Sequence, residues 1–267
     1  MQDKQTAKEK VKKFWNDDTC GTVEIDKEKF TKEYFDEIER IRYSREPEVK
    51  EFAQFHEGRG KKLLEVGVGA ATDFCNWLRN GAKAHGIDLT PSAIEHARHR
   101  VELEGLEAEE LRVADCENLP FEDESFEMVY SWGVIHHTPD TPKAAKEIIR
   151  VLKPGGKAKI MVYNRKSVLA VMFWIKHALL RGRPGMTINE VLNNHMESFG
   201  TKGYTPDEIR EMLAGQPIKN LEVDTITTYY DRAERFGLPQ RTVSKILRAV
   251  MDKKNSGWFL TFTFEKA

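Results

Sequence analysis

The spacing of apolar positions divides the chain into two parts. In residues 1–58, apolar side chains such as Tyr34, Phe35 and Ile38 recur three and four positions apart among Lys and Glu, which is typical of amphipathic helices. In residues 59–267, short aliphatic runs alternate with helical stretches, as in a parallel sheet with crossover helices on both faces. We therefore expect a helical N-terminal extension followed by a larger α/β domain.

Capping and turn residues mark the elements of the α/β part. Thr90-Pro91 and Thr141-Pro142 predict helix starts, because a hydroxyl caps the helix and the following proline needs no amide partner. Gly81 and Gly105 are predicted to end helices, and Pro47 to begin a short helix in the extension. The predicted strands are 63–66, 82–87, 111–114, 128–131 and 158–163.

The alternation breaks after residue 163. Residues 164–219 are predicted to be a helical insertion, in which Thr205 and Glu208 form a capping box at a helix start. The chain is then expected to close with a strand near 221–229, a helix around 243–251 and a strand from 258 to 264.

Composition excludes several classes of partner. The 42 Lys and Arg residues nearly balance the 43 Asp and Glu, and the net charge of -1 argues against binding to nucleic acid or to an anionic membrane. The longest apolar run, residues 168–175, is far shorter than the ~20 residues of a membrane span. The three cysteines are widely spaced and outside any CxxC pattern, which indicates neither disulfides nor a metal site. With a charged N-terminus, this favours a cytoplasmic protein.

A glycine loop is the first candidate for chemistry. The first predicted strand ends in Gly67-Val68-Gly69 and runs directly into a helix, so backbone amides can approach a ligand closely. Asp88 follows Gly67 by 21 residues, at the tip of the neighbouring strand, where a carboxylate can accept hydrogen bonds from ribose hydroxyls. The pair predicts a site for an adenosine-containing cofactor.

Two cofactor classes fit such a loop. A nicotinamide-dependent oxidoreductase would need a third glycine where this chain has Thr72. The amino group of S-adenosylmethionine favours an acidic neighbour such as Glu65, whereas a pyrophosphate needs helix N-terminal amides. Glu65 favours S-adenosylmethionine and leaves the oxidoreductase as the alternative.

At this point the chain resembles a known family over roughly residues 55 to 165. It is similar to the class I S-adenosylmethionine-dependent methyltransferases of the type that includes the ubiquinone and menaquinone C-methyltransferases. The resemblance is carried by five ordered segments, a combination that is hard to obtain by chance. They are Leu63-Leu64-Glu65-Val66-Gly67-Val68-Gly69, Gly86-Ile87-Asp88-Leu89-Thr90, Val113-Ala114-Asp115-Cys116-Glu117-Asn118-Leu119-Pro120-Phe121, Phe126-Glu127-Met128-Val129-Tyr130-Ser131-Trp132 and Arg150-Val151-Leu152-Lys153-Pro154-Gly155-Gly156.

The resemblance implies a Rossmann-like sheet of seven strands in the order 3-2-1-4-5-7-6, with the last strand antiparallel. It further implies that Asp115 receives the adenine amino group, that the Cys116 amide faces a ring nitrogen and that Leu89 covers the ring. Ser131 and Trp132 would border the methionine portion. The family often has Gly at position 71, where this chain has Ala71, and we expect binding to survive this departure.

The sulfonium of S-adenosylmethionine is an activated methyl donor, so the protein mainly has to align the acceptor and exclude water. His136 or His137, just after the fourth predicted strand, could accept a proton from the acceptor. The alternative is that both rings only cap the next helix or pack beneath the cofactor.

The expected reaction is methyl transfer to a small organic acceptor of a biosynthetic pathway, with S-adenosyl-L-homocysteine as product. Whether O, N, S or C is methylated stays open, and so does the choice between monomer and homodimer. A catalytically silent binding module with the same fold is a further alternative. Candidate acceptor contacts, for each of which simple packing is the other interpretation, are Trp15, Tyr34, Tyr43, Tyr163, His195, Glu197 and Tyr204.

Overall fold

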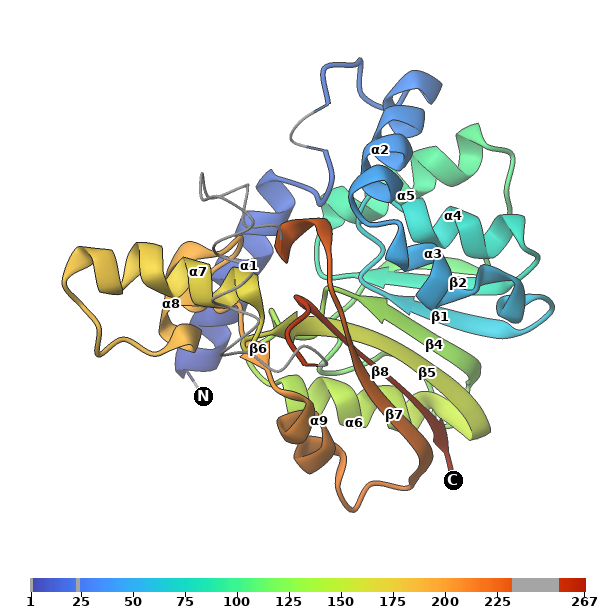
Figure 1. Ribbon diagram of the computed structural model, residues 1–267. Coiled ribbons are helices and arrows are strands. Elements are labelled where there is room, and N and C mark those ends of the chain that lie inside the picture. The colour runs from blue at the N-terminus through green and yellow to red at the C-terminus, as the bar shows by residue number, and fades with distance from the viewer. Residues whose placement is uncertain (1, 23–24, 232–254) are drawn as a thin grey trace.

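A twisted sheet crosses the centre of the computed structural model, with helices on both of its faces (Figure 1). The structure describes residues 2–22, 25–231 and 255–267. Eight strands from these described residues make up the sheet, in the order β3-β2-β1-β4-β5-β8-β7, with β6 paired to β5 outside this path. The strands are β1 (Lys62–Val66), β2 (Lys83–Asp88), β3 (Glu110–Val113), β4 (Phe126–Trp132), β5 (Leu152–Asn164), β6 (Gly203–Tyr204), β7 (Ile218–Ile226) and β8 (Phe259–Lys266).

The helices lie before, between and beyond these strands. Figure 1 shows α2, α3 and α4 on one face of the sheet and α6 and α9 on the other. The α-helices are α1 (Gln2–Asp17), α2 (Lys32–Arg45), α3 (Glu48–Ala53), α4 (Thr72–Arg79), α5 (Pro91–Leu103), α6 (Thr141–Val151), α7 (Val168–His177), α8 (Ile188–His195) and α9 (Pro206–Leu213). Short 3-10 helices are η1 (Phe55–Gly58), η2 (Leu179–Arg181) and η3 (Tyr229–Asp231).

The central strands are parallel and buried on both faces. Leu63 of β1 pairs with Ala84 of β2 and with Met128 of β4, and all three side chains are fully buried. Continuous apolar runs are typical of strands covered by helices on both sides. β8 enters antiparallel between β5 and β7, with Ile160 opposite Phe262, so the strand order and direction expected from the resemblance are confirmed.

One short strand, β6, adds to the expected seven and pairs outside their order. Gly203 and Tyr204 pair in parallel with Tyr163 and Asn164 at the end of β5. Only glycine fits there, because a Cβ on Gly203 would lie 2.7 Å from the Cβ of Arg165. A two-residue strand leaves no periodic pattern, so the sequence did not indicate it.

Several helices and strands begin at residues other than those predicted from the sequence. Asp140, not Thr141, caps α6, since its side chain accepts from the Lys143 amide, and Pro47 is the N-cap rather than the first residue of α3. The capping boxes at Thr205 and at Thr187 are both formed. β5 begins six residues before the expected 158, and β7 runs over Ile218–Ile226 rather than 221–229. The helix expected around 243–251 lies outside the described residues.

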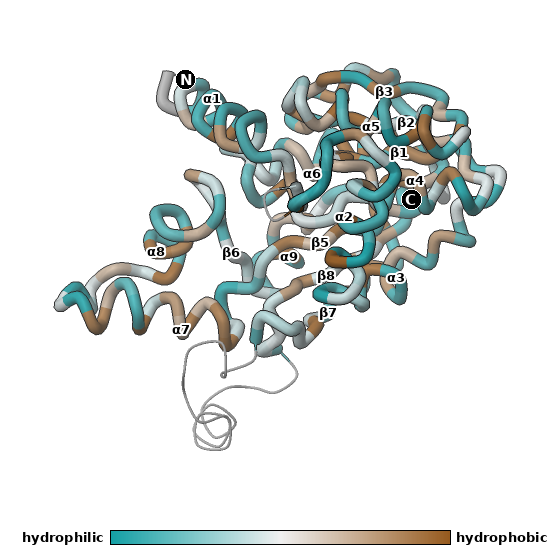
Figure 2. The backbone as a smooth tube through the Cα atoms, turned by 90° about the horizontal axis from the view of Figure 1, so that it is seen from above, coloured by the Kyte–Doolittle hydropathy of each residue, from teal (hydrophilic) through white to brown (hydrophobic). Residues whose placement is uncertain are grey.

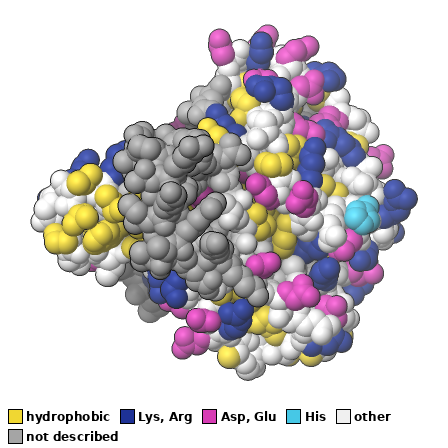
Figure 3. Space-filling view, in the orientation of Figure 1, with side chains coloured by type: hydrophobic (Ala, Val, Ile, Leu, Met, Phe, Trp, Pro, Cys, Tyr) yellow, Lys and Arg dark blue, Asp and Glu magenta, His cyan; other side chains and the backbone are white. Residues whose placement is uncertain are grey.

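Two apolar clusters fill the space on either side of the sheet. One contains the buried faces of α3, α4 and α5, and the other contains those of α6 and α9. Figure 2 shows α7 and α8 projecting from this body as a lobe of their own, with α1 near it. Basic and acidic side chains are interspersed over the face seen in Figure 3, without a large field of one sign.

Arg100 connects the extension to the α/β part from a fully buried position. Its guanidinium donates to Glu104 at 2.9 Å, to the Thr72 hydroxyl at 2.9 Å and to Glu39 of α2. A buried charge is tolerated only when it is paired and hydrogen-bonded, so this arginine holds α2, α4 and α5 in one arrangement.

Replacing Arg100 by Met should therefore lower the free energy of unfolding by about 3 kcal/mol, because Glu39 and Glu104 lose a buried partner. The exposed Arg98 on the same helix is a matched control, and Arg98→Met should cost less than about 0.5 kcal/mol. Urea unfolding of both variants measures the difference. Equal stabilities would refute the role given to Arg100.

Candidate functional site

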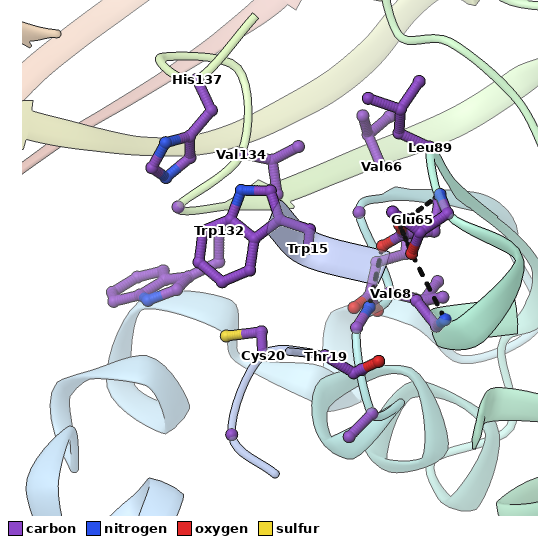
Figure 4. Close-up of a pocket in the computed structure, with 18 of the residues that line it drawn as sticks. Trp15, Thr19, Cys20, Glu65, Val66, Val68, Leu89, Trp132, Val134 and His137 are labelled. Carbon is purple, nitrogen blue, oxygen red and sulfur yellow. Dashed lines mark hydrogen bonds between the residues drawn. The ribbon is translucent and has the colours of Figure 1, made fainter. Parts of the chain in front are cut away.

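A cavity of about 350 Å³ opens beyond the carboxyl ends of β1, β2 and β4. The strand order turns around between β1 and β4, and ligands of open α/β sheets bind at such a switch point. Figure 4 shows Glu65, Val68 and Leu89 together at one end of the cavity, while Trp15, Trp132 and His137 lie at the other. The cavity thus has one end formed by the α/β core and a second end that the helical segments help to build.

Residues of β2 and of the turn after β4 fix the conformation of the glycine loop. The amides of Gly67 and Val68 both donate to the carbonyl of Ile87, at 2.8 and 3.1 Å. Gly67 has a φ of +85°, and a Cβ there would lie 2.2 Å from Cγ2 of Val134. Both facts require glycine at position 67. Ala71 also adopts left-handed backbone, with a φ of 60°, at a cost that glycine would avoid.

Asp88 ends β2 beside this loop and lines the cavity. Its carboxylate accepts from the Gly69 amide at 3.1 Å and from the amide and hydroxyl of Thr90, both at 3.0 Å. Burial raises its pKa above the ordinary value, while these three donors oppose the shift. The carboxylate is therefore fixed in place, with capacity for further donors from the cavity.

Glu65 is the clearest sign that the cavity receives a donor. It is buried, lines the cavity, and its Oε2 has no hydrogen-bond partner among the described residues. Burial raises its pKa well above the usual range, and the nearby carboxylates of Asp73 and Asp88 raise it further. An amino group placed here would satisfy an acceptor that is otherwise costly to bury.

Asp115, Cys116 and Leu89 also line the cavity. A residue that the sequence did not indicate joins them: Lys8 of α1 donates to Asp115 at 2.5 Å and to Glu117 at 2.7 Å. Burial raises the pKa of the Cys116 thiol to about 12, so this sulfur stays protonated. Nothing in the spacing of α1 distinguishes Lys8 from the other lysines of that helix.

A second polar cluster lies around Asp73 and Glu46. Asp73 accepts hydrogen bonds from Arg42 at 3.0 Å, from Tyr43 at 3.0 Å and from Tyr130 at 2.9 Å. Arg42 also donates to Glu46 at 2.6 Å, and Glu46 accepts from the indole of Trp132 at 3.2 Å and from the hydroxyl of Tyr230 at 3.0 Å. The predictions omitted Arg42, Glu46 and Tyr230, which the chain brings together only by folding.

The two neighbouring histidines have different surroundings. His136 is fully buried against the ring of Tyr163 at 4.0 Å and does not line the cavity, so packing is the interpretation that fits it. His137 lines the cavity, and its Nδ1 contacts the hydroxyls of Thr201 at 3.0 Å and Ser198 at 2.9 Å. Burial lowers the pKa of His137 to about 3, which keeps its ring neutral.

Several expected contacts lie away from the cavity lining. Ser131 is buried and donates to the carbonyl of Val66, Tyr34 is buried against His96, and Tyr43 belongs to the Asp73 cluster. His195 is exposed and stacks on His177. These side chains satisfy packing or hydrogen-bonding needs of their own surroundings. The same holds for Tyr163, which stacks on Trp258, and for Tyr204, which packs against the apolar cluster that includes α6 and α9. Trp15 does line the cavity.

Two further features of the described residues concern metal ligands and membrane-spanning helices. Within the described ranges, no three His, Cys, Asp or Glu side chains are grouped as ligands of a metal ion. The helices of the described part of the chain are all too short or too polar to cross a bilayer.

The fit between Gly67 and Val134 gives a testable prediction. Gly67→Ala should lower the free energy of unfolding by about 3 kcal/mol, through left-handed strain and overpacking against Val134. Gly105→Ala, with a φ of +63° and no atom within 4 Å of the added Cβ, should show the strain alone, about 1 kcal/mol. Adding Val134→Ala to Gly67→Ala should recover part of the loss in urea unfolding. No recovery would contradict the proposed clash.

Comparison with known proteins places these residues in context. Residues 64–160 match a family model described as a methyltransferase domain. A phthiotriol/phenolphthiotriol dimycocerosates methyltransferase of Mycobacterium leprae is 38% identical over 99 residues, which are 36% of this chain and 36% of that protein. The match thus spans about a third of that curated relative's length.

Solved structures are similar over nearly the whole chain, but at low identity. A geranyl diphosphate C-methyltransferase from Streptomyces coelicolor superposes with a TM-score of 0.66 at 15% identity, covering 98% of each chain. The [4+2]-cyclase SpnF has a TM-score of 0.56 at 18% identity, covering 99% of this chain and 96% of its own. Such identities establish the fold alone. Residues 64–160 thus form a methyltransferase domain, in a chain with the fold of the class I S-adenosylmethionine-dependent methyltransferases.

Proposed function

We propose that this protein transfers the methyl group of S-adenosylmethionine to a small organic acceptor. The observation that carries the proposal is the buried Glu65, which lines the same cavity as Asp88 and whose Oε2 has no partner among the described residues. The two carboxylates suit the two polar ends of that cofactor, since one can receive an amino group and the other the ribose hydroxyls. The cofactor would supply an activated methyl group there.

The remaining contacts follow from the same cavity. Asp115 and the Cys116 amide would bind the adenine edge, with Leu89 against the ring, and Trp132 would border the methionine portion. Gly67 and Gly69 give the cofactor access to the backbone. Ser131 would act only indirectly, by holding the end of β1 through its hydrogen bond to the Val66 carbonyl.

Asp73 weighs against the oxidoreductase alternative. A pyrophosphate binds where helix N-terminal amides face it, but the first turn of α4 carries the buried carboxylate of Asp73, which lines the cavity. Thr72, at the position of the missing third glycine, is buried and accepts from Arg100. An anionic diphosphate at this helix end would meet a carboxylate.

Residues 1–58 are proposed to form a lid, and residues 164–219 a cap, over the acceptor end of the cavity. Support comes from the lining, which includes Val11 and Trp15 of α1, Ile38 of α2 and Glu197 just beyond α8. Closure by these segments would exclude water from the reacting methyl group. An acceptor enclosed in this way is a small molecule. We further propose that the protein acts in the cytoplasm, as a monomer or homodimer.

Calorimetry with S-adenosylhomocysteine tests the proposal. The wild-type protein should bind it, and Asp88→Ala should weaken binding about a hundredfold, the equivalent of about 3 kcal/mol for charge-assisted hydrogen bonds to the ribose. Asp207→Ala, on the exposed face of α9, is the control and should bind normally. Binding of a nicotinamide dinucleotide instead would favour the oxidoreductase, and binding of neither would favour the silent module.

Cofactor binding should also release a proton from Glu65. Burial raises its pKa, and a bound ammonium would lower it by favouring the carboxylate. Affinity for S-adenosylhomocysteine should therefore rise from pH 6 to pH 8, and titrations in buffers of different ionisation enthalpy should detect the proton. In Glu65→Gln both effects should vanish, and their persistence would mean that another group titrates.

A further inference from the structure

Glu197 and His137 present two hydrogen-bond acceptors to the far end of the cavity, which both residues line. Glu197 Oε2 and His137 Nε2 are 3.9 Å apart, too far for a direct hydrogen bond. The carboxylate accepts from the Tyr163 hydroxyl at 3.0 Å and retains lone pairs. Nε2 is buried and has no partner among the described residues.

The contacts of His137 favour one of its two neutral tautomers. The Thr201 hydroxyl donates to the Ser198 carbonyl at 2.7 Å, so that only lone pairs of its oxygen remain for His137 Nδ1 at 3.0 Å. A bare Nδ1 would place its lone pair against the Thr201 oxygen, so the Thr201 contact favours a protonated Nδ1 that donates, and the Ser198 hydroxyl at 2.9 Å can accept from the same hydrogen. Because burial keeps the ring neutral, Nε2 is left with a lone pair.

Two acceptors at this separation suit one donor atom between them. An atom about 2.9 Å from each can bind both, provided that it carries at least two hydrogens. An ammonium nitrogen meets this condition, whereas an alcohol has a single hydrogen and would leave one acceptor unsatisfied.

The charges and rings around this position also favour a cation. The carboxylate of Glu46 is already paired with Arg42 at 2.6 Å, but no Lys or Arg of the described residues pairs with Glu197. Its side chain keeps 45% of its surface accessible. The Trp15 ring packs against His137 at 5.3 Å, and Trp132 lies at the same end (Figure 4). Aromatic faces attract ammonium ions.

We propose that His137 Nε2 and Glu197 Oε2 together hold the nitrogen of the methyl acceptor, which is a primary or secondary amine that enters as its ammonium ion. The inference rests on the proposed function and names its acceptor class. Before the nitrogen can attack, one N–H bond must break, and the proton passes to the Glu197 carboxylate as an O–H bond forms.

The surroundings of Glu197 suit that proton transfer. Partial burial raises its pKa, the Glu46 carboxylate raises it further, and the hydrogen bond from Tyr163 opposes the shift. The 45% of the side chain that stays accessible limits the effect of burial. Other titratable neighbours among the described residues are the Cys20 thiol, the Tyr230 hydroxyl and the neutral His137 ring. A base with a pKa near the working pH is the most effective proton acceptor.

Benzylamine and benzyl alcohol are matched probes of similar shape for this site. Both would be titrated calorimetrically into the full chain saturated with S-adenosylhomocysteine. Benzylamine should bind at least about tenfold more tightly than the alcohol, and its affinity should rise from pH 6 to pH 8 as Glu197 ionises while the alkyl amine stays protonated.

Variants separate this inference from the proposed function. Glu197→Gln should reduce the preference for benzylamine over benzyl alcohol to below about threefold, while its affinity for S-adenosylhomocysteine stays unchanged. Glu211→Gln, at an exposed position of α9, is the control and should change neither quantity. His137→Phe should also reduce the preference, because the second acceptor is lost. Equal binding of the two probes, no binding of either, or an unchanged preference in Glu197→Gln would overturn the amine site. If the wild-type protein did not bind S-adenosylhomocysteine at all, the proposed function would be overturned instead.

Discussion

The buried carboxylate of Asp73 is the interaction on which the arrangement of the two parts of the chain depends. It lies in the first turn of α4, directly after the glycine loop, and accepts hydrogen bonds from Arg42 and Tyr43 of α2 and from Tyr130 of β4. A buried charge without partners would be strongly destabilising. The extension must therefore dock where its arginine reaches this carboxylate, and that position brings the segment after α1 and the end of α2 to the cavity.

Charge is distributed unevenly between the surface and the cavity. The whole chain is close to neutral, yet the cavity lining contains more carboxylates than cations, and burial raises the pKa of Glu65, Asp88 and Glu197. Such a site stabilises positively charged ligands once they are desolvated, because opposite charges attract more strongly in a low dielectric. A sulfonium cofactor and a cationic acceptor both match this environment, and the cationic ligands would in turn keep the carboxylates ionised.

The α/β core and its cofactor end could be predicted because their signals are local. Short aliphatic runs, capping residues and the Gly67-Val68-Gly69 turn each depend on neighbours a few positions away. Glu65, Asp88 and Asp115 lie at or just beyond the carboxyl ends of β1, β2 and β3. These ends meet at one edge of a parallel sheet, so the shared cavity follows from the order of the strands. The sequence did not predict β6, because this strand depends on contact between segments about forty residues apart.

The acceptor end was decided by tertiary structure. Tyr34 and Tyr43 were candidates of equal standing with Trp15, but the packing of α1 and α2 leaves only Trp15 of these three in the cavity lining. His136 and His137 are adjacent in sequence, and the turn after β4 buries one against Tyr163 and leaves the other facing Glu197. The sequence by itself determined the alternation of strands and helices, the glycine loop and the carboxylates at the strand ends, because each of these signals arises within one β-turn-α unit. Only the folded chain could decide which side chains of distant helices meet around His137, since such contacts depend on packing between segments that share no sequence pattern.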